Sequence, residues 1–155
     1  MKITVLFTGK TADRYVAEGI AAYEKRIRRY LPFEVREINP GKTPKEIHAV
    51  KQAEGRSLLK ALDKKTFVIL LDERGERVSS VEFAKIVERK MVEGTKNLAF
   101  ITGGAYGVGD EVYHRADKVI SLSPMTFSHQ VVRILLMEQL YRAFTIIHGE
   151  PYHHA

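Results

Sequence analysis

The sequence predicts an α/β protein with a mainly parallel sheet and helices on both of its faces. Short apolar strands alternate with segments of helical spacing along the whole chain. Two strands, TFVILLD and NLAFITGG, are apolar almost throughout, as expected at the centre of a parallel sheet covered on both sides. Strands separated by helices imply βαβ crossovers. No linker, repeat or low-complexity tract divides the chain, so we expect one domain over residues 1–155.

The first half of the chain supplies two strands and two helices. KITVLFTG is a strand, and residues 11–31 carry apolar side chains at helical spacing. FEVREIN alternates in polarity and ends at a Pro-Gly turn signal. Thr43 to Glu46 match a capping box with proline at the first helical position, so we predict a helix from there to about Leu62.

The second half continues the alternation. After the strand TFVILLD, Ser79 and Glu82 form a second capping box, which opens a helix that Gly94 closes. NLAFITGG and KVISLS are the next two strands. The last helix, VVRILLMEQLYRAFTII, is apolar around most of its circumference, more than one core face needs. Such a helix is deeply buried or forms a subunit interface, and we favour the interface, in a homodimer.

The glycine-rich stretch FITGGAYGVGDEV raises the question of a ligand, because glycines after a strand let backbone approach closely. Val112 stands where a dinucleotide-binding fingerprint needs Gly or Ala. Asp110 and Glu111 stand where a Walker loop needs Lys and Ser or Thr. In parallel sheets, ligands gather beyond the carboxyl ends of the strands. We therefore expect this loop, LLDERGE and LSPMTFSHQ to enclose a flat, weakly charged ligand, although each alone also fits a plain turn or helix cap.

Composition narrows the function classes. The 25 Lys and Arg against 19 Asp and Glu give a net charge of +6, which favours an acidic partner such as nucleic acid. The absence of cysteine excludes disulfides, thiolate zinc sites, cysteine-held iron–sulfur clusters and thiol nucleophiles. His148, His153 and His154 have no neighbouring carboxylate set, so we expect no metal site. No leader-like or membrane-spanning apolar run is present, and we expect a cytoplasmic protein without a membrane partner.

Six stretches carry a resemblance to a known family: MKITVLFTGK, AYEKRI, LLDERGERVSS, FITGGAYGV, LSPMTFSHQVVRILLMEQLYRAF and PYHH. On these stretches the chain resembles the pseudouridine N3-methyltransferases of the bacterial large ribosomal subunit, which belong to the SPOUT class. The resemblance implies a C-terminal deep trefoil knot, an exception to the rule that chains are unknotted. It also implies S-adenosylmethionine as cofactor, 23S ribosomal RNA in the large subunit or the assembled ribosome as substrate, and a homodimer.

The resemblance also implies site residues. The cofactor-binding residues are Leu71, Gly103, Leu122, Ser123, Pro124, Met125, Thr126 and Phe127. The catalytic residues are His129, Arg142, Tyr152 and His153. Gly103 would let backbone approach the cofactor, so we expect Gly103→Val to abolish cofactor binding in a folded protein. The cofactor has no phosphate and carries a sulfonium cation, which suits the acidic pair after the glycines.

The lack of cysteine bears on the reaction that the resemblance implies. Methylation of a pyrimidine C5 ordinarily needs an attacking cysteine, and radical methylation needs a cysteine-held cluster. Methylation of N3 needs only deprotonation, alignment with the methyl group and exclusion of water. Arg142 would bind phosphate or carbonyl oxygens, because a guanidinium stays charged and donates in a fixed fork. His129 would serve as the base or as an RNA anchor.

The tail, residues 152–155, is expected to serve the RNA, and in a dimer it would reach the partner's pocket. Its aromatic ring can stack on a flipped base. Two other functions remain open at this point. One is a non-catalytic RNA-binding ribosome-assembly protein, which the net charge of +6 and the basic run from Lys25 to Arg29 also fit. The other is a flavodoxin-like nucleotide-binding module, against which the failed phosphate motifs weigh.

Overall fold

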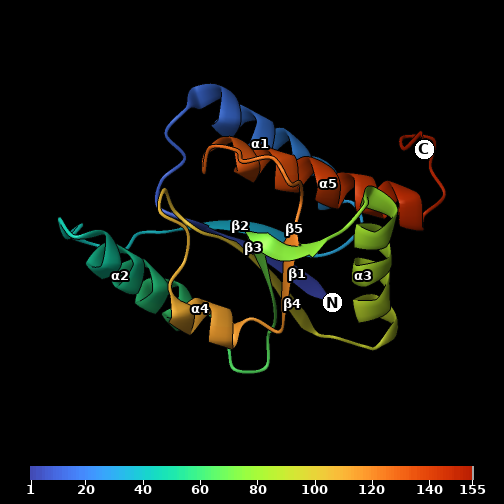
Figure 1. Ribbon diagram of the computed structural model, residues 1–155. Helices are drawn as coiled ribbons and strands as arrows, with labels where there is room; N and C mark the ends of the chain where they lie inside the picture. The colour runs from blue at the N-terminus through green and yellow to red at the C-terminus, as the bar shows by residue number, and fades with distance from the viewer. Residues whose placement is uncertain (155) are drawn as a thin grey trace.

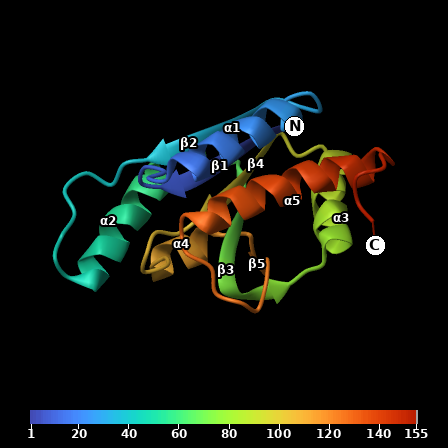
Figure 2. The ribbon, with the colours of Figure 1, turned by 90° about the horizontal axis from the view of Figure 1, so that it is seen from above.

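The computed structural model describes residues 1–154 and contains a five-stranded sheet in the order β2-β1-β4-β3-β5 (Figures 1 and 2). The strands are β1 (Lys2–Thr8), β2 (Phe33–Ile38), β3 (Phe67–Arg77), β4 (Asn97–Thr102) and β5 (Lys118–Ser121). The helices are α1 (Arg14–Ile27), α2 (Ile47–Lys60), α3 (Ser80–Val92), α4 (Asp110–Arg115) and α5 (Val131–Ile147). Every neighbouring pair of strands is parallel, which confirms the predicted α/β class.

Helices cover both faces of the sheet, as predicted (Figure 1). The larger core lies between the sheet and α1, α3 and α5, and the smaller one lies on the face of α2 and α4. Consecutive residues of β4 alternate between the two: Phe100 belongs to the larger core and Ile101 to the smaller, and both are fully buried. Burial on both faces explains why this strand is apolar throughout.

The last helix is more deeply buried within one subunit than the sequence prediction favoured. α5 packs against both α1 and α3, and none of its residues is fully exposed. Gly19 of α1 leaves no room for a Cβ against the side chain of Ile134, so the two helices approach closely. Core packing therefore accounts for much of the apolar surface of α5. Half-exposed apolar side chains remain, among them Val131, Leu135 and Ile146.

Both early helices are shorter than predicted. α2 begins at Ile47, and its N-cap residue Glu46 makes no side-chain capping bond, so the capping box expected at Thr43 is wrong. The reason is burial: no residue between Phe33 and Val50 is buried, so nothing packs an additional turn against the sheet. α1 begins only at Arg14. In contrast, the capping box at the start of α3 is present with both of its hydrogen bonds.

β3 runs further than predicted and contains a bulge that shapes the site. Leu71 and Glu76 both pair with Ile120 of β5, so residues 72–75 bulge out of the ladder. A Cβ on Gly75 would lie 2.7 Å from backbone atoms of Ile120, which makes glycine necessary there. The stretch expected to be a surface turn is therefore an irregular part of one long strand, held on both sides by pairing with β5.

Candidate active site

A cavity of about 550 Å³ lies beyond the carboxyl ends of β3, β4 and β5, where the sequence predicted a ligand. Three segments wall it: the β3 bulge (residues 72–75), the glycine loop (residues 103–109) and the approach loop (residues 122–130), which leads into α5. Seven of the eight predicted cofactor-binding residues line the cavity: Leu71, Gly103, Leu122, Ser123, Met125, Thr126 and Phe127. The eighth, Pro124, belongs to the approach loop but does not line the cavity.

Twelve further residues line the cavity. Nine of them belong to LLDERGE and FITGGAYGVGDEV, two of the stretches expected to enclose a ligand: Asp72, Glu73, Arg74, Thr102, Gly104, Ala105, Tyr106, Gly107 and Val108. The other three, Lys51, Ser121 and Val132, lie outside the stretches that were expected to enclose it. Lys51 belongs to α2, and no motif in the sequence indicated that it lies at the cavity.

The glycine loop is a tight turn that itself requires two of its glycines, Gly103 and Gly107. The Gly107 N–H donates to the Gly104 carbonyl at 3.1 Å, and Gly107 has a φ of +78°. A Cβ on Gly103 would lie 2.8 Å from the Gly107 carbonyl carbon and 2.9 Å from Val108 Cγ1. The side chain of a Gly103→Val variant would therefore first meet the Gly107–Val108 part of the loop, which itself lines the cavity. The loss of cofactor binding expected for this variant stays a prediction, and distortion of the loop is an additional cause of that loss.

We expect Gly103→Ala to weaken both the loop and cofactor binding. Its Cβ needs the Gly107–Val108 backbone to shift, because backbone atoms cannot rotate away as a side chain can. Calorimetry with S-adenosylmethionine should show affinity reduced at least about tenfold, with a melting temperature lowered by several degrees. Gly109→Ala is the matched control, because a Cβ there meets Lys51 only at 3.7 Å or more. Equal effects of the two substitutions would contradict this account of Gly103.

Charged side chains line one side of the cavity. Burial raises the pKa of Asp72, but hydrogen bonds from Tyr113 and Arg74 outweigh burial and leave the pKa below its ordinary value. Arg74 donates to Asp72 at 3.1 Å and lies over the Tyr113 ring, 4.7 Å from its centroid. Glu73 accepts a hydrogen bond from Thr126 of the approach loop at 3.3 Å. The β3 bulge therefore presents the carboxyl groups of Asp72 and Glu73 beside the cavity, and the lowered pKa of Asp72 suits a cationic ligand.

The remaining walls fit an uncharged aromatic group. The Thr102 hydroxyl is buried at the end of β4, beside the cavity, and has no hydrogen-bond partner within residues 1–154. Tyr106, Met125 and Phe127, three of the large apolar side chains exposed in the described chain, line this one cavity. Backbone, an unpaired hydroxyl, apolar side chains and carboxylates together suit S-adenosylmethionine, which combines an adenine ring with a sulfonium cation. Among residues 1–154, no group of three or more His, Asp or Glu side chains could share a metal ion.

His129 lies at this cavity, half-buried, in the turn just before α5. The Ser128 hydroxyl accepts from the Val131 N–H at 3.1 Å, and its carbonyl accepts from the Val132 N–H, so Ser128 caps the turn that carries His129. Burial, and secondly the charge of Arg133, lower the pKa of His129 below its ordinary value. The imidazole is therefore neutral at neutral pH and can accept a proton.

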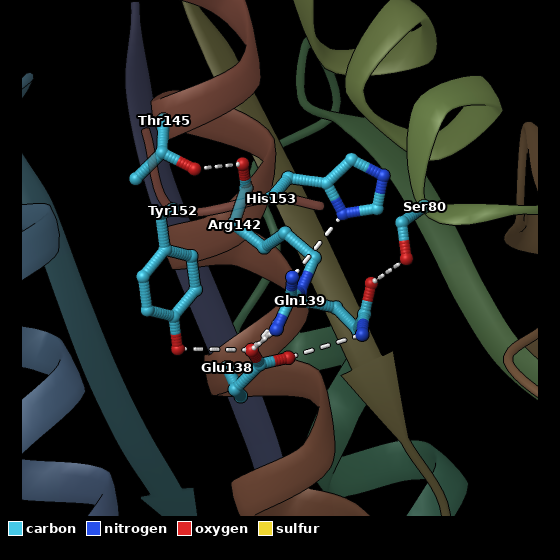
Figure 3. A network of polar contacts seen from close by, with 7 residues as sticks. All are labelled: Ser80, Glu138, Gln139, Arg142, Thr145, Tyr152 and His153. Carbon is cyan, nitrogen blue, oxygen red and sulfur yellow. Dashed lines mark hydrogen bonds and ion pairs between the residues drawn. The ribbon is translucent and has the colours of Figure 1, made fainter. Parts of the chain in front are cut away.

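The other three predicted catalytic residues, Arg142, Tyr152 and His153, form a separate cluster with Glu138, which we call the tail cluster (Figure 3). Glu138 accepts from Arg142 Nε at 3.1 Å and from the Tyr152 hydroxyl at 3.1 Å. His153 Nδ1 lies 3.2 Å from Arg142 Nη1. Glu138 therefore connects α5 to the tail and organises the cluster.

Packing adds to these polar contacts. The Tyr152 ring meets Tyr141 edge-on at 4.8 Å, and the Arg142 guanidinium lies 4.7 Å from the Tyr152 ring centroid. Burial, together with neighbouring Tyr23 and Glu138, raises the pKa of Tyr152 to about 12. The hydrogen bond and charge of Glu138 raise the pKa of Arg142, despite partial burial. At neutral pH the cluster therefore presents a phenol that keeps its proton and a guanidinium that keeps its charge.

The tail cluster does not share the cavity of its own chain. His129 precedes α5, whereas Arg142 lies thirteen residues further along, roughly 20 Å at the rise of an α-helix. Figure 1 shows the chain's C-terminal end at the far end of α5 from the approach loop. The structure thus brings Arg142, Tyr152 and His153 together and keeps His129 apart from them.

The chain matches the family model described as "Predicted SPOUT methyltransferase" over residues 1–153. The chain belongs to the SPOUT methyltransferase family. Full-length relatives of this SPOUT methyltransferase carry the name ribosomal RNA large subunit methyltransferase H. The protein from Geotalea daltonii is 49% identical over 154 residues, covering 99% of this chain and 100% of its own. The proteins from Geobacter sulfurreducens and Cytophaga hutchinsonii are 48% and 47% identical, each with 99% of this chain and 100% of their own covered.

Solved structures resemble this SPOUT methyltransferase in fold. A methylase-family protein from Haemophilus influenzae superposes with a TM-score of 0.56 at 13% identity, covering 99% of this chain and 70% of the other. A methyltransferase from Bordetella pertussis gives a TM-score of 0.56 at 14% identity, with 92% and 95% covered. In residues 1–154 of the methyltransferase, no helix is long and apolar enough to cross a membrane.

Proposed function

We propose that this SPOUT methyltransferase transfers a methyl group from S-adenosylmethionine to N3 of a pseudouridine in the 23S RNA of the large ribosomal subunit. The observation that carries the proposal is the cavity at three strand ends, walled by seven of the eight residues expected to bind this cofactor. The relatives named as large-subunit RNA methyltransferases match the chain from end to end, which supports the substrate. Membership of a methyltransferase family weighs against a non-catalytic RNA-binding protein.

S-adenosylmethionine, when bound, supplies an electrophilic methyl group. The glycine loop and the approach loop would hold the adenosine part through backbone groups and through Leu71, Leu122 and Phe127. Asp72 and Glu73 of the β3 bulge would face the cationic part of the cofactor. Apolar side chains at the mouth of the cavity, including Tyr106 and Met125, would exclude water from the reacting atoms.

His129 would accept the proton of the N3 imide. Its pKa lies below the ordinary value, so the imidazole is neutral and has a free lone pair at the pH of the cytoplasm, where the ribosomal substrate is found. His129 lines the cavity, and a base that acts on a flipped nucleotide bound there has to lie at its wall. This supports the role of base over that of an RNA anchor.

The tail cluster would bind the RNA in the cavity of a partner subunit. Arg142 would donate to phosphate or carbonyl oxygens, and the Tyr152 ring would stack on the flipped base. Because the cluster lies far from the cavity of its own chain, a homodimer with composite sites unites all four predicted catalytic residues. The half-exposed apolar side chains of α5 provide a surface for that dimer.

We also propose the family's trefoil knot for residues 72–130, where the β3 bulge and approach loop wall one cavity.

The test is transfer of labelled methyl to ribosomal particles from cells that lack this modification, followed by nucleoside analysis. We expect label in N3-methylpseudouridine, from either large subunits or assembled ribosomes. Particles that carry uridine in place of pseudouridine are the control and should remain unlabelled. Label in any other nucleoside would refute the proposed specificity, and binding of the particles without transfer would support the non-catalytic alternative.

A further inference from the structure

Arg133, in the first turn of α5, is completely buried, and it is the largest fully buried side chain in the described part of the protein. Its guanidinium donates to the Thr8 carbonyl at 2.6 Å, to the Gly9 carbonyl at 3.0 Å and to Thr11 Oγ1 at 2.9 Å. It also lies 5.0 Å from the Phe7 ring centroid. These contacts all belong to the end of β1 and the loop that follows it.

Gln130, one turn earlier, binds the same loop. Its side-chain oxygen accepts from the Ala12 N–H at 2.9 Å, and its amide donates to the Lys10 carbonyl at 3.3 Å. Five hydrogen bonds from Gln130 and Arg133 therefore fasten the β1–α1 loop to the start of α5. His129 and Val132, which line the cavity, alternate with these two residues along the chain.

The burial of this charge is costly for a purely structural contact. The three hydrogen bonds go to neutral oxygens, and the Nε–H has no partner within residues 1–154. Desolvation lowers the pKa of Arg133, and Glu37 of β2 only partly offsets it, but a guanidinium remains charged. A neutral amide or an apolar side chain would avoid the desolvation cost. We therefore infer that the charge of Arg133 has a role in addition to packing.

That role lies beside His129. Charged side chains that line the cavity come from α2 (Lys51) and from β3 (Asp72, Glu73 and Arg74). None of these groups changes the pKa of His129 as Arg133 does, whose charge lowers it. The same side chain thus holds the segment that carries His129 and supplies its electrostatic neighbour.

We propose that Arg133 is a positioning residue: by fastening the β1–α1 loop to the first turn of α5, it fixes His129 at the mouth of the cofactor cavity and keeps a permanent positive charge behind it. The proposal rests on the proposed function in so far as His129 serves methyl transfer. A second consequence is that His129 remains neutral in the free enzyme, ready to accept a proton.

The experiment compares Arg133→Met with Arg133→Lys in the full-length protein. Methionine keeps the apolar stem over Phe7 without charge, whereas lysine keeps the charge and loses the fork of donors. Imidazole titrations are followed by NMR in histidine-labelled protein, with the His129 signal assigned from a His129→Asn variant. In Arg133→Met, we expect the pKa of His129 to rise toward its ordinary value and methyl transfer to fall about 10- to 100-fold. In Arg133→Lys, transfer should also fall, but the pKa should stay low.

Gln130→Ala keeps the buried charge and removes two of the five hydrogen bonds, so it should lower transfer several-fold without moving the pKa of His129. If the pKa and the chemical shift of His129 were both unchanged in Arg133→Met, the proposal would be overturned. If that variant does not fold, unchanged transfer in both Arg133→Lys and Gln130→Ala would overturn it. The titration needs no RNA, so it tests Arg133 even if the chain methylates a different nucleoside.

Discussion

A chain ending at Pro151 should bind S-adenosylmethionine with wild-type affinity and lose methyl transfer to ribosomes by on the order of 100-fold or more. The deletion removes Tyr152 and His153 but no residue that lines the cavity. Loss of stacking on one base costs about 1–3 kcal/mol by itself, and the loss of a group that orients the reactants adds to it. Calorimetry with the cofactor and labelled methyl transfer to ribosomal particles measure the two effects separately.

The structure also sets the stability expected of this deletion. Tyr152 is half-buried, packs edge-on against Tyr141 and bonds Glu138, so its removal should lower the melting temperature by about 5 °C at most. Tyr152→Phe is the matched control, because it keeps the ring and loses only the hydroxyl bond to Glu138, and it should retain most of the transfer. A deletion that lowers turnover only a few-fold, or that melts far below the wild type, would argue against a role of the tail in catalysis.

Two inactive chains should restore activity when they form a mixed dimer. His129→Ala has a defective cavity and an intact tail cluster, whereas the chain ending at Pro151 has an intact cavity and a defective cluster. If each active site combines the cavity of one subunit with the tail cluster of the other, a mixed dimer has one intact site of two. Half of the dimers in an equal mixture are mixed, so we expect about one quarter of wild-type transfer.

The control mixture joins the chain ending at Pro151 with Arg142→Ala. Both lesions lie in the tail cluster, so no intact site forms and activity should stay at background. Light scattering establishes that the chains are dimers, and native mass spectrometry establishes that they exchange subunits. Confirmed exchange without recovery in the His129→Ala mixture would contradict the composite site, and a monomer in solution would contradict the dimer itself.

The strand ends that form the site could be predicted from the sequence because the signals there are local. An apolar run followed by glycines, as in NLAFITGG, indicates both a buried strand and a turn at its end. The carboxyl ends of parallel strands lie at one edge of the sheet, so the segments that follow these strands in the sequence could be predicted to wall one cavity. The capping box of α3 is equally local and was correct, whereas the one proposed for α2 failed because no buried side chain supports that turn.

What the sequence by itself determined is the α/β class, the family resemblance, and the loops that wall the cavity. Only the tertiary structure decided how these residues are grouped. Arg142, Tyr152 and His153 meet around Glu138 because the chain turns back after α5, and His129 remains at the other end of that helix. Likewise, only the tertiary structure shows that Arg133 is fully buried against the end of β1. Hydrogen bonds between residues more than a hundred positions apart depend on packing, which local patterns do not encode.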